Sequence, residues 1–184
     1  MDMIPEVYGG DVGITALQFA CGSCDVTGAA NNGIELFNPA LTGTAQLLNA
    51  KLITVTGIIV WGAQAAAVNV DIWNTTNAAL VGTAATIPAQ WMDHRRSIQV
   101  AGGQTADAPI GVLKQGNLAS VAAGFDANTT QMFREVLAAS QLIPFKLPWN
   151  QDISPGTGML VTVANAAAVR SVVSLIWIER AQTS

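Results

Sequence analysis

Apolar and polar residues alternate in short runs between positions 51 and 180. Residues Leu52–Trp61 are rich in Val, Ile and Thr, which favour strands. Further along, Val68, Val70 and Ile72 fall on one face of a predicted strand, and the polar residues between them fall on the other. Gly, Pro and Asn separate the runs and predict turns. The predicted turns include Gly62–Gln64, Asn74–Asn77 and Ile153–Gly158.

The last run, Val169–Arg180, predicts a long strand that is apolar on both faces. One face carries Val172, Ile176 and Ile178, and the other carries Val173, Leu175 and Trp177. A strand that is apolar on both faces is buried on both sides. We expect one face in the core and the other against a second subunit or the N-terminal arm. The candidate subunit-interface residues are Val173, Leu175 and Trp177.

Two regions give weaker patterns. Met132, Val136 and Ala139 have helical spacing within Thr130–Leu142, but a strand through Phe133–Leu137 fits nearly as well, so both interpretations stay open. The first fifty residues contain turn-rich segments, which are Tyr8–Asp11, Cys21–Asp25 and Asn31–Gly33. They predict an extended arm and lead-in.

Short strands separated by turns at steady spacing predict an all-β, antiparallel sandwich of the jelly-roll kind. We place the arm at residues 1–50 and the sandwich at residues 51–184.

Hydrophobic residues make up 51% of the 184 residues and charged residues only 11%, with a net charge of -4. An intrinsically disordered chain needs the opposite balance. Eight basic residues against twelve acidic ones provide no stripe for nucleic acid, so no nucleic-acid partner is expected. So little charge makes solubility easier when further surface is covered by a partner, which favours a homo-oligomer, with a trimer as the expected state.

The mean hydropathy of +0.39 raises the question of a membrane. A spanning helix needs about 20 nearly continuous apolar residues. The best windows, Leu52–Val70 and Val161–Ile178, are broken by polar residues. Acids and a proline occupy Met1–Glu6, where a signal peptide has basic residues and then an apolar run. We expect no membrane partner and no export.

Candidate chemistry is sparse. Cys21 and Cys24 form a C-x-x-C pair, but a zinc site needs four ligands and the chain adds only His94 besides carboxylates. A thioredoxin-like motif requires a βαβ context, which this sequence does not predict. Two thiols in a loop is the favoured interpretation, and whether they form a disulfide stays open. No Gly-x-Ser-x-Gly elbow and no phosphate loop occurs. We therefore expect no enzyme activity, no metal and no cofactor.

The five tryptophans divide by context. Trp61, Trp73 and Trp177 lie on predicted strands and are expected in a core or an interface. Trp91 and Trp149 lie in loops or beside proline, and would stack on a pyranose ring if the domain bound a glycan.

Three runs resemble small jelly-roll modules found in carbohydrate-binding domains and in the decoration (cement) proteins of tailed-phage heads: Gly57–Trp61, Val68–Gly82 and Ile153–Val163. The low charge, the Ala- and Gly-rich body and the predicted arm are more similar to the second group. This resemblance implies a capsid decoration protein in the virion, assembled in the host cytoplasm, whose partners are the major capsid protein and other copies of itself. A carbohydrate-binding module and a tail, neck or fibre component are the alternatives.

Overall fold

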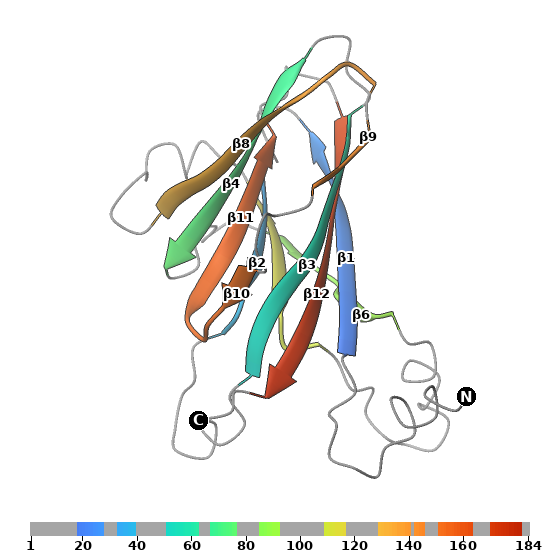
Figure 1. Cartoon of the computed structure of the whole chain (residues 1–184). Helices are drawn as coiled ribbons and strands as arrows, with labels where there is room; N and C mark the ends of the chain where they lie inside the picture. The colour runs from blue at the N-terminus through green and yellow to red at the C-terminus, as the bar shows by residue number, and fades with distance from the viewer. Residues whose placement is uncertain are drawn as a thin grey trace, which may run out of the picture.

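The computed structural model describes residues 18–27, 33–39, 51–62, 67–76, 85–92, 109–116, 129–140, 142–145, 151–163 and 170–181. These residues form strands and no helix, and every strand pairing is antiparallel. Figure 1 shows two sheets face to face. The predicted all-β antiparallel sandwich is confirmed. In the described part of the chain no helix is long and apolar enough to cross a membrane.

Sheet A has the order β10-β3-β12-β1-β6, and β9 pairs with the same strand, β3, as β10 does. Its strands are β1 (Gln18–Thr27), β3 (Lys51–Gly62), β6 (Gln90–Trp91), β9 (Leu142–Phe145), β10 (Gln151–Ile153) and β12 (Arg170–Ala181). The centre of the sheet is the long pair β3 and β12 (Figure 1).

Sheet B has the order β5-β7-β2-β11-β4-β8. Its strands are β2 (Gly33–Phe37), β4 (Val68–Thr76), β5 (Ala85–Ile87), β7 (Val112–Gly116), β8 (Thr129–Leu137) and β11 (Thr157–Val163). The chain passes from sheet A to sheet B and back several times, since β1, β3 and β12 lie in one sheet and β2, β4 and β11 in the other.

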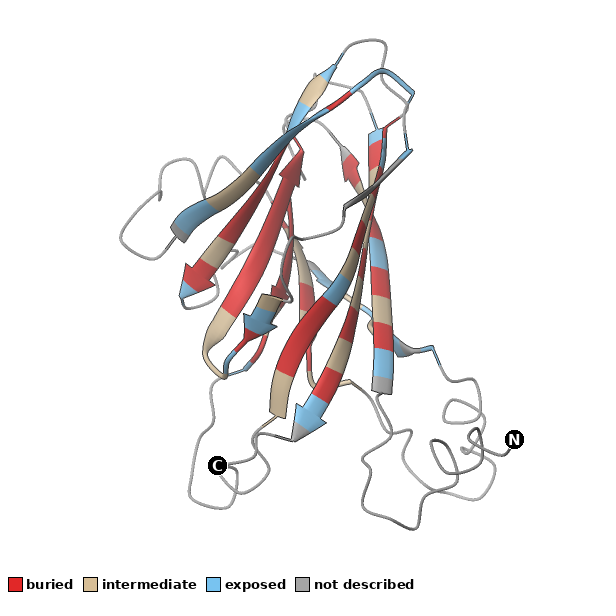
Figure 2. Ribbon diagram, in the orientation of Figure 1, coloured by how far each residue is buried: buried red, intermediate tan, exposed pale blue. Residues whose placement is uncertain are grey.

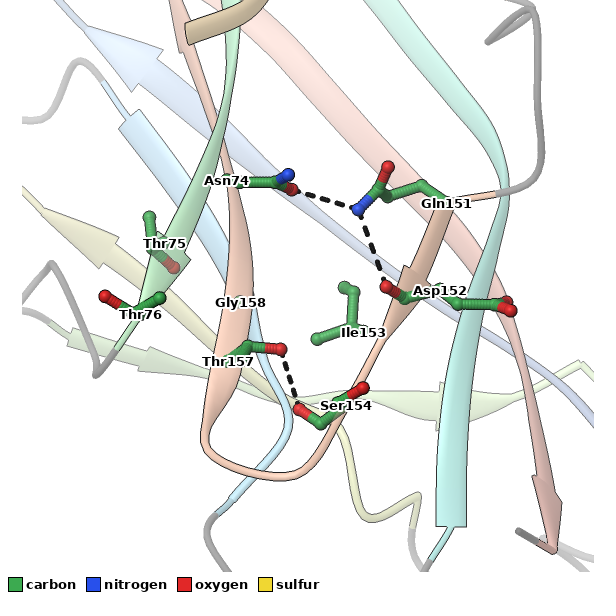
Figure 3. A pocket seen from close by; sticks show the side chains of 9 residues that line it. All are labelled: Asn74, Thr75, Thr76, Gln151, Asp152, Ile153, Ser154, Thr157 and Gly158. Carbon is green, nitrogen blue, oxygen red and sulfur yellow. Dashed lines mark hydrogen bonds between the residues drawn. The ribbon is translucent and has the colours of Figure 1, made fainter. Parts of the chain in front are cut away.

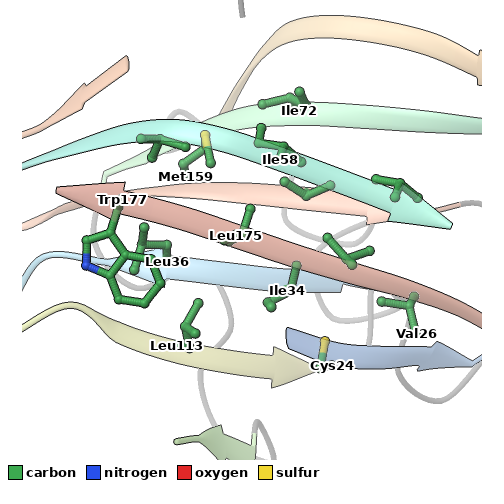
Figure 4. Packing of buried hydrophobic residues seen from close by; sticks show 14 of the residues in the cluster. Cys24, Val26, Ile34, Leu36, Ile58, Ile72, Leu113, Met159, Leu175 and Trp177 are labelled. Carbon is green, nitrogen blue, oxygen red and sulfur yellow. The ribbon is translucent and has the colours of Figure 1, made fainter. Parts of the chain in front are cut away.

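The hydrophobic core fills the space between the sheets. Alternate residues along β1, β12 and most of β3 are buried, which gives these strands a striped pattern in Figure 2. In sheet B, β2 and β11 are buried along most of their length. Trp177 is fully buried and packs with aliphatic side chains from both sheets (Figure 4). Core members from the two sheets include Val26, Ile34, Leu36, Ile58, Ile72, Leu113, Met159 and Leu175.

One buried acid lies among these apolar side chains. The Glu179 carboxylate accepts hydrogen bonds from the Gly111 backbone N–H at 2.9 Å and from Trp177 Nε1 at 3.2 Å. Its second oxygen lies 3.7 Å from the Lys51 ammonium. Gly111 directly precedes β7, so the carboxylate ties sheet A to the start of a strand in sheet B.

Asn38 makes a second tie between the sheets. Its buried side-chain amide donates to the backbone oxygens of Lys51, at 3.0 Å, and Ile153, at 2.9 Å. Its backbone N–H donates to the Thr157 oxygen, and its own oxygen accepts from the Gly156 N–H. Asn38, the residue that follows β2, therefore connects the ends of β3, β10 and β11.

The turn predicted at Ile153–Gly158 is confirmed. The Thr157 backbone N–H donates to the Ser154 oxygen at 3.0 Å, and Gly156 has a φ of 82°. Pro155 at the second position and a positive φ at the third are the marks of a type II turn. The turn joins β10 of sheet A to β11 of sheet B.

Several local predictions need correction. Cys21–Asp25 is not a turn, because these residues lie within β1 and pair with β12. Residues 74–76 continue β4, where we predicted a turn. The helical interpretation of Thr130–Leu142 is wrong, since β8 runs to Leu137 and β9 begins at Leu142.

Residues that we assigned to the arm and lead-in contribute two strands to the sandwich, β1 to sheet A and β2 to sheet B. The remainder of residues 1–50, except Asn38 and Pro39, lies outside the described residues.

Candidate functional site

The outer face of sheet A carries exposed apolar side chains. Trp61 on β3 lies between Val172 on β12 and Leu142 on β9 in the strand register. Trp61 is 41% exposed and Leu142 is 59% exposed, which is high for side chains of this size. These three residues form an apolar band across three strands.

A second apolar band crosses the other end of the same face. Phe19 on β1 pairs with Ile178 on β12, and the Met92 backbone N–H donates to the Phe19 oxygen at 2.9 Å. Phe19 and Met92 are exposed, and Ile178 is partly buried. Four of the five exposed large hydrophobic side chains in the described residues thus belong to these two bands.

Two pairs of opposite residues on β1 and β12 lie between the bands. Cys21 lies opposite Ile176, and Ser23 lies opposite Ser174, whose hydroxyl donates to that of Ser23 at 3.1 Å. All lie on the side of β1 and β12 that faces away from the core. We call the two bands and these middle residues the outer face of sheet A.

Charges on this face lie in pairs near its ends. Arg170 forms an ion pair with Asp25 on the neighbouring strand. Arg180 donates to Asp152 at 2.8 Å, and Thr54 also donates to Asp152, at 2.6 Å. Each pair cancels its own charge, so the described part of this face presents a neutral, mostly apolar surface.

A separate polar pocket lies where β4 and β11 of sheet B approach β10 of sheet A (Figure 3). Its volume is about 240 Å³. Gln151 donates to the Asn74 side-chain oxygen at 2.9 Å, and the Thr157 hydroxyl donates to the Ser154 oxygen at 2.7 Å. The lining is Asn74, Thr75, Thr76, Gln151, Asp152, Ile153, Ser154, Thr157 and Gly158. Amides and hydroxyls dominate this lining, and no aromatic ring is part of it.

Three aspartates near these surfaces form ion pairs with arginines of the same chain. Arg134 makes a two-pronged contact with Asp71, and Gln131 donates to the same carboxylate at 2.7 Å. The hydrogen bonds to Asp71, helped by its negative charge, raise the pKa of Arg134. Asp25 and Asp152 each hold an arginine as described above. In the described ranges no three His, Cys, Asp or Glu side chains gather as a metal site.

The two cysteines point to opposite sides of β1. Cys21 is partly buried on the outer face, and Cys24 is buried in the core. Both are free thiols. Burial, and then the neighbouring Asp25 charge, raise the pKa of Cys24 to about 12. The raised pKa keeps this buried thiol protonated at neutral pH, which lowers its reactivity as a nucleophile.

The predicted interface residues lie on the inner side of β12. Val173, Leu175 and Trp177 are fully buried in the core of their own chain, so their side chains are not available to another subunit. Their alternate neighbours, Val172 and Ile176, face outward. The sequence identifies the two apolar faces of this strand, and the structure places the three predicted interface residues on the face that packs into the core.

The other predicted residues are placed only in part. The Trp91 backbone pairs with Ala20, and its side chain lies outside the described residues. Trp149 and His94 also lie outside them. Among the strand tryptophans, Trp73 and Trp177 are buried as expected, and Trp61 is exposed. Ile58 and Val60 are buried, and this alternation along β3 is the signal that places Trp61 outside.

Comparisons with protein-family models, with curated proteins and with solved structures find no match for this chain.

Proposed function

We propose that the protein is a virion structural protein, a decoration (cement) protein that stabilises a tailed-phage head by binding between capsid subunits, and that its sandwich is a jelly roll. The strand order carries the proposal. Within the two six-stranded sheets, β1-β12-β3-β10 are consecutive neighbours in one and β2-β11-β4-β8 in the other. This order of eight strands supports a jelly roll, an architecture used in viral capsid and lectin domains.

The chemistry of the surface supports a structural role. A cement protein adds stability by covering apolar surface between capsid subunits, without catalysis. Trp61 and Leu142 supply exposed apolar surface on a rigid sheet, and the acids Asp25, Asp71 and Asp152 are bound to arginines of the same chain. Such a surface is suited to contact with protein rather than to acid–base work on a substrate.

Weak contacts are sufficient in this role because symmetry repeats them. Apolar area stabilises a contact by about 25 cal/mol per Å² when buried, but each association also costs the freedom of the partner. When one oligomer binds the capsid at several equivalent points, most of its translational and rotational freedom is lost at the first contact. The later contacts therefore add stability at a smaller entropic cost. We expect the major capsid protein and other copies of this chain as partners.

Peptide mass spectrometry of purified particles tests this function. Hundreds of copies per particle support decoration. A dozen copies or fewer assign the protein to a neck, tail or fibre, and absence from particles removes the virion role.

A carbohydrate-binding module is the second candidate, because jelly rolls also occur in lectins and the polar pocket offers amides and hydroxyls that bind sugar hydroxyls. Glycan-array binding that is lost in Trp91→Ala or Trp149→Ala would favour a stacking site. Loss in Asn74→Ala, with both tryptophan variants still binding, would place the sugar in the pocket.

A further inference from the structure

We propose that the outer face of sheet A is a self-association surface, and that its occupant is the same face of a second copy of this chain. The proposal gives a location to the self-association expected above, and it does not depend on a role in the virion. Its starting point is the concentration of exposed apolar side chains on one face.

The exposed apolar residues form two bands on one face rather than isolated points. Trp61 and Leu142 lie on neighbouring strands, and so do Phe19 and Ile178. Val136, which is 55% exposed, is the remaining exposed large hydrophobic residue described, and it lies on β8 in sheet B. Single exposed apolar residues are ordinary on a soluble protein, but a contiguous patch marks an interaction site.

The size of the face fits a dimer contact. Four strand positions at about 4.8 Å spacing and about ten residues at roughly 3.3 Å each give about 20 Å by about 30 Å, on the order of 600 Å². A stable interface of standard size buries about 800 Å² on each partner. The corrugation of the side chains raises the area above the flat value, so two such faces reach the range of stable complexes.

The charges allow two identical faces to meet. A face with charges of one sign would repel its own copy and would select a partner of the opposite sign. Here Asp25 is bound to Arg170, and Asp152 is bound to Arg180, within one chain. Among the described residues of this face, the contact therefore brings no unpaired like charges together, and the apolar bands provide the attraction.

A sheet face is also a suitable shape for its own copy. Two sheets pack face to face about 10 Å apart, as the two layers of this sandwich already do. A patch that meets itself generates a two-fold dimer. The structure thus favours a dimer, where the sequence led us to expect a trimer.

Light scattering on the purified full-length chain tests the proposal. We expect twice the 19.1 kDa mass of one chain at micromolar concentration. Leu142→Glu and Trp61→Glu should weaken the dimer about tenfold or more, because each places a charge within one of the two apolar bands that make the contact. Val136→Glu is the matched control, equally exposed but on sheet B, and should leave the mass unchanged.

Cys21 provides a second measurement that needs no substitution. It lies between the apolar bands, so the dimer should shield it, and its alkylation should slow as protein concentration rises. Far-UV circular dichroism and the urea midpoint establish that the variants are folded.

Three outcomes overturn the proposal: a monomer at micromolar concentration, a trimer that Leu142→Glu leaves intact, or a dimer that dissociates only in Val136→Glu. A monomer whose copy number on particles falls in Leu142→Glu would assign the face to the capsid instead, and the decoration role would stand. A dimer that is absent from particles would support the face and remove the virion role.

Discussion

The Glu179 carboxylate and the Lys51 ammonium lie 3.7 Å apart, at the paired ends of β12 and β3. The carboxylate is buried, whereas the lysine reaches it from the edge of the sandwich and remains about a third exposed. A buried charge persists only when it is paired and hydrogen-bonded. Oε1 of Glu179 accepts hydrogen bonds from the Gly111 backbone and the Trp177 indole. Among the described residues Oε2 has no hydrogen-bond partner and is stabilised by the charge of the Lys51 ammonium alone.

Removal of this carboxylate should destabilise the fold. Glu179→Ala leaves the Gly111 N–H and the Trp177 indole N–H without their acceptor inside the core, and we expect a loss of about 3 kcal/mol. Glu179→Gln keeps an acceptor oxygen and should lose less. Urea unfolding followed by tryptophan fluorescence measures both. Exposed Glu135→Ala is the control, and an alanine variant at position 179 as stable as this control would contradict the prediction.

Asn38 gives a prediction that depends on pH. Asn38→Asp places a carboxylate against the carbonyl oxygens of Lys51 and Ile153, which accept hydrogen bonds and cannot donate them. We expect a loss of about 3 kcal/mol at pH 7. Once protonated, the introduced carboxyl group can donate to one of these oxygens, so the folded state raises the pKa of the new acid above its ordinary value of about 3.9.

The deficit of Asn38→Asp should therefore shrink as the pH falls from 7 toward 4, because the new acid becomes protonated first in the folded state. Urea midpoints measured across this range follow the effect. Asn69→Asp, at an exposed position on β4, is the matched control and should show no such recovery. A deficit at position 38 that stays constant or grows on acidification would disprove the account.

Gly158 should not tolerate a methyl group. A Cβ built there lies 2.6 Å from the Thr75 hydroxyl oxygen and 3.1 Å from the Leu36 backbone oxygen. That hydroxyl is fixed by its hydrogen bond to buried Glu35, so Gly158→Ala should cost about 1–3 kcal/mol through overpacking. At Gly57 the nearest atom lies 3.5 Å from the added carbon, so Gly57→Ala should be neutral or slightly stabilising. Thermal unfolding of both variants decides the point, and equal effects would argue against steric exclusion at Gly158.

We predict that the buried Cys24 thiol makes the folded protein less stable in alkali. Its pKa is raised from 9.0 to about 12 by burial, so the unfolded chain loses the proton first. The protonated Cys24 thiol makes its full contribution to the free energy of unfolding below pH 9. This contribution declines as the pH rises toward 12, by at most about 4 kcal/mol. Cys24→Ala should show a shallower decline of the urea midpoint over this range. At pH 8 a thiol reagent should modify Cys21 well before Cys24 in the native protein, and equal rates would contradict the placement of Cys24 in the core.

The sequence predicts the fold class because β-branched runs and turn residues are local signals. The turn at Ser154–Thr157 is an example, where Pro155 and Gly156 each fit one corner. The same local signals fail at Cys21–Cys24, because Gly and Ser favour a turn in isolation. Pairing with β12 along the whole of β1 overrides this preference, and such long-range pairing has no mark in the local pattern.

The candidate interface shows a similar limit. The alternation along β12 separates Val173 from Val172, but it does not say which of two apolar faces meets sheet B. Glu179 lies on the same side of β12 as Val173, and it accepts a hydrogen bond from the Gly111 backbone next to β7 of sheet B. This contact identifies the side of β12 that faces sheet B. The signal in the sequence is Ser174, because a polar residue in the middle of one face favours the solvent side for that face.

The pairing of β1 with β12 has a consequence for synthesis. Residues near the start of the described chain, 18–27, must wait for residues 170–181 before they find their hydrogen-bonding partner. While the ribosome works, β1 and β3 lack the strand that lies between them, and their open edges are exposed to other nascent chains. Sheet A can therefore be completed only after β12 has emerged, and a chain truncated before residue 170 should aggregate rather than fold.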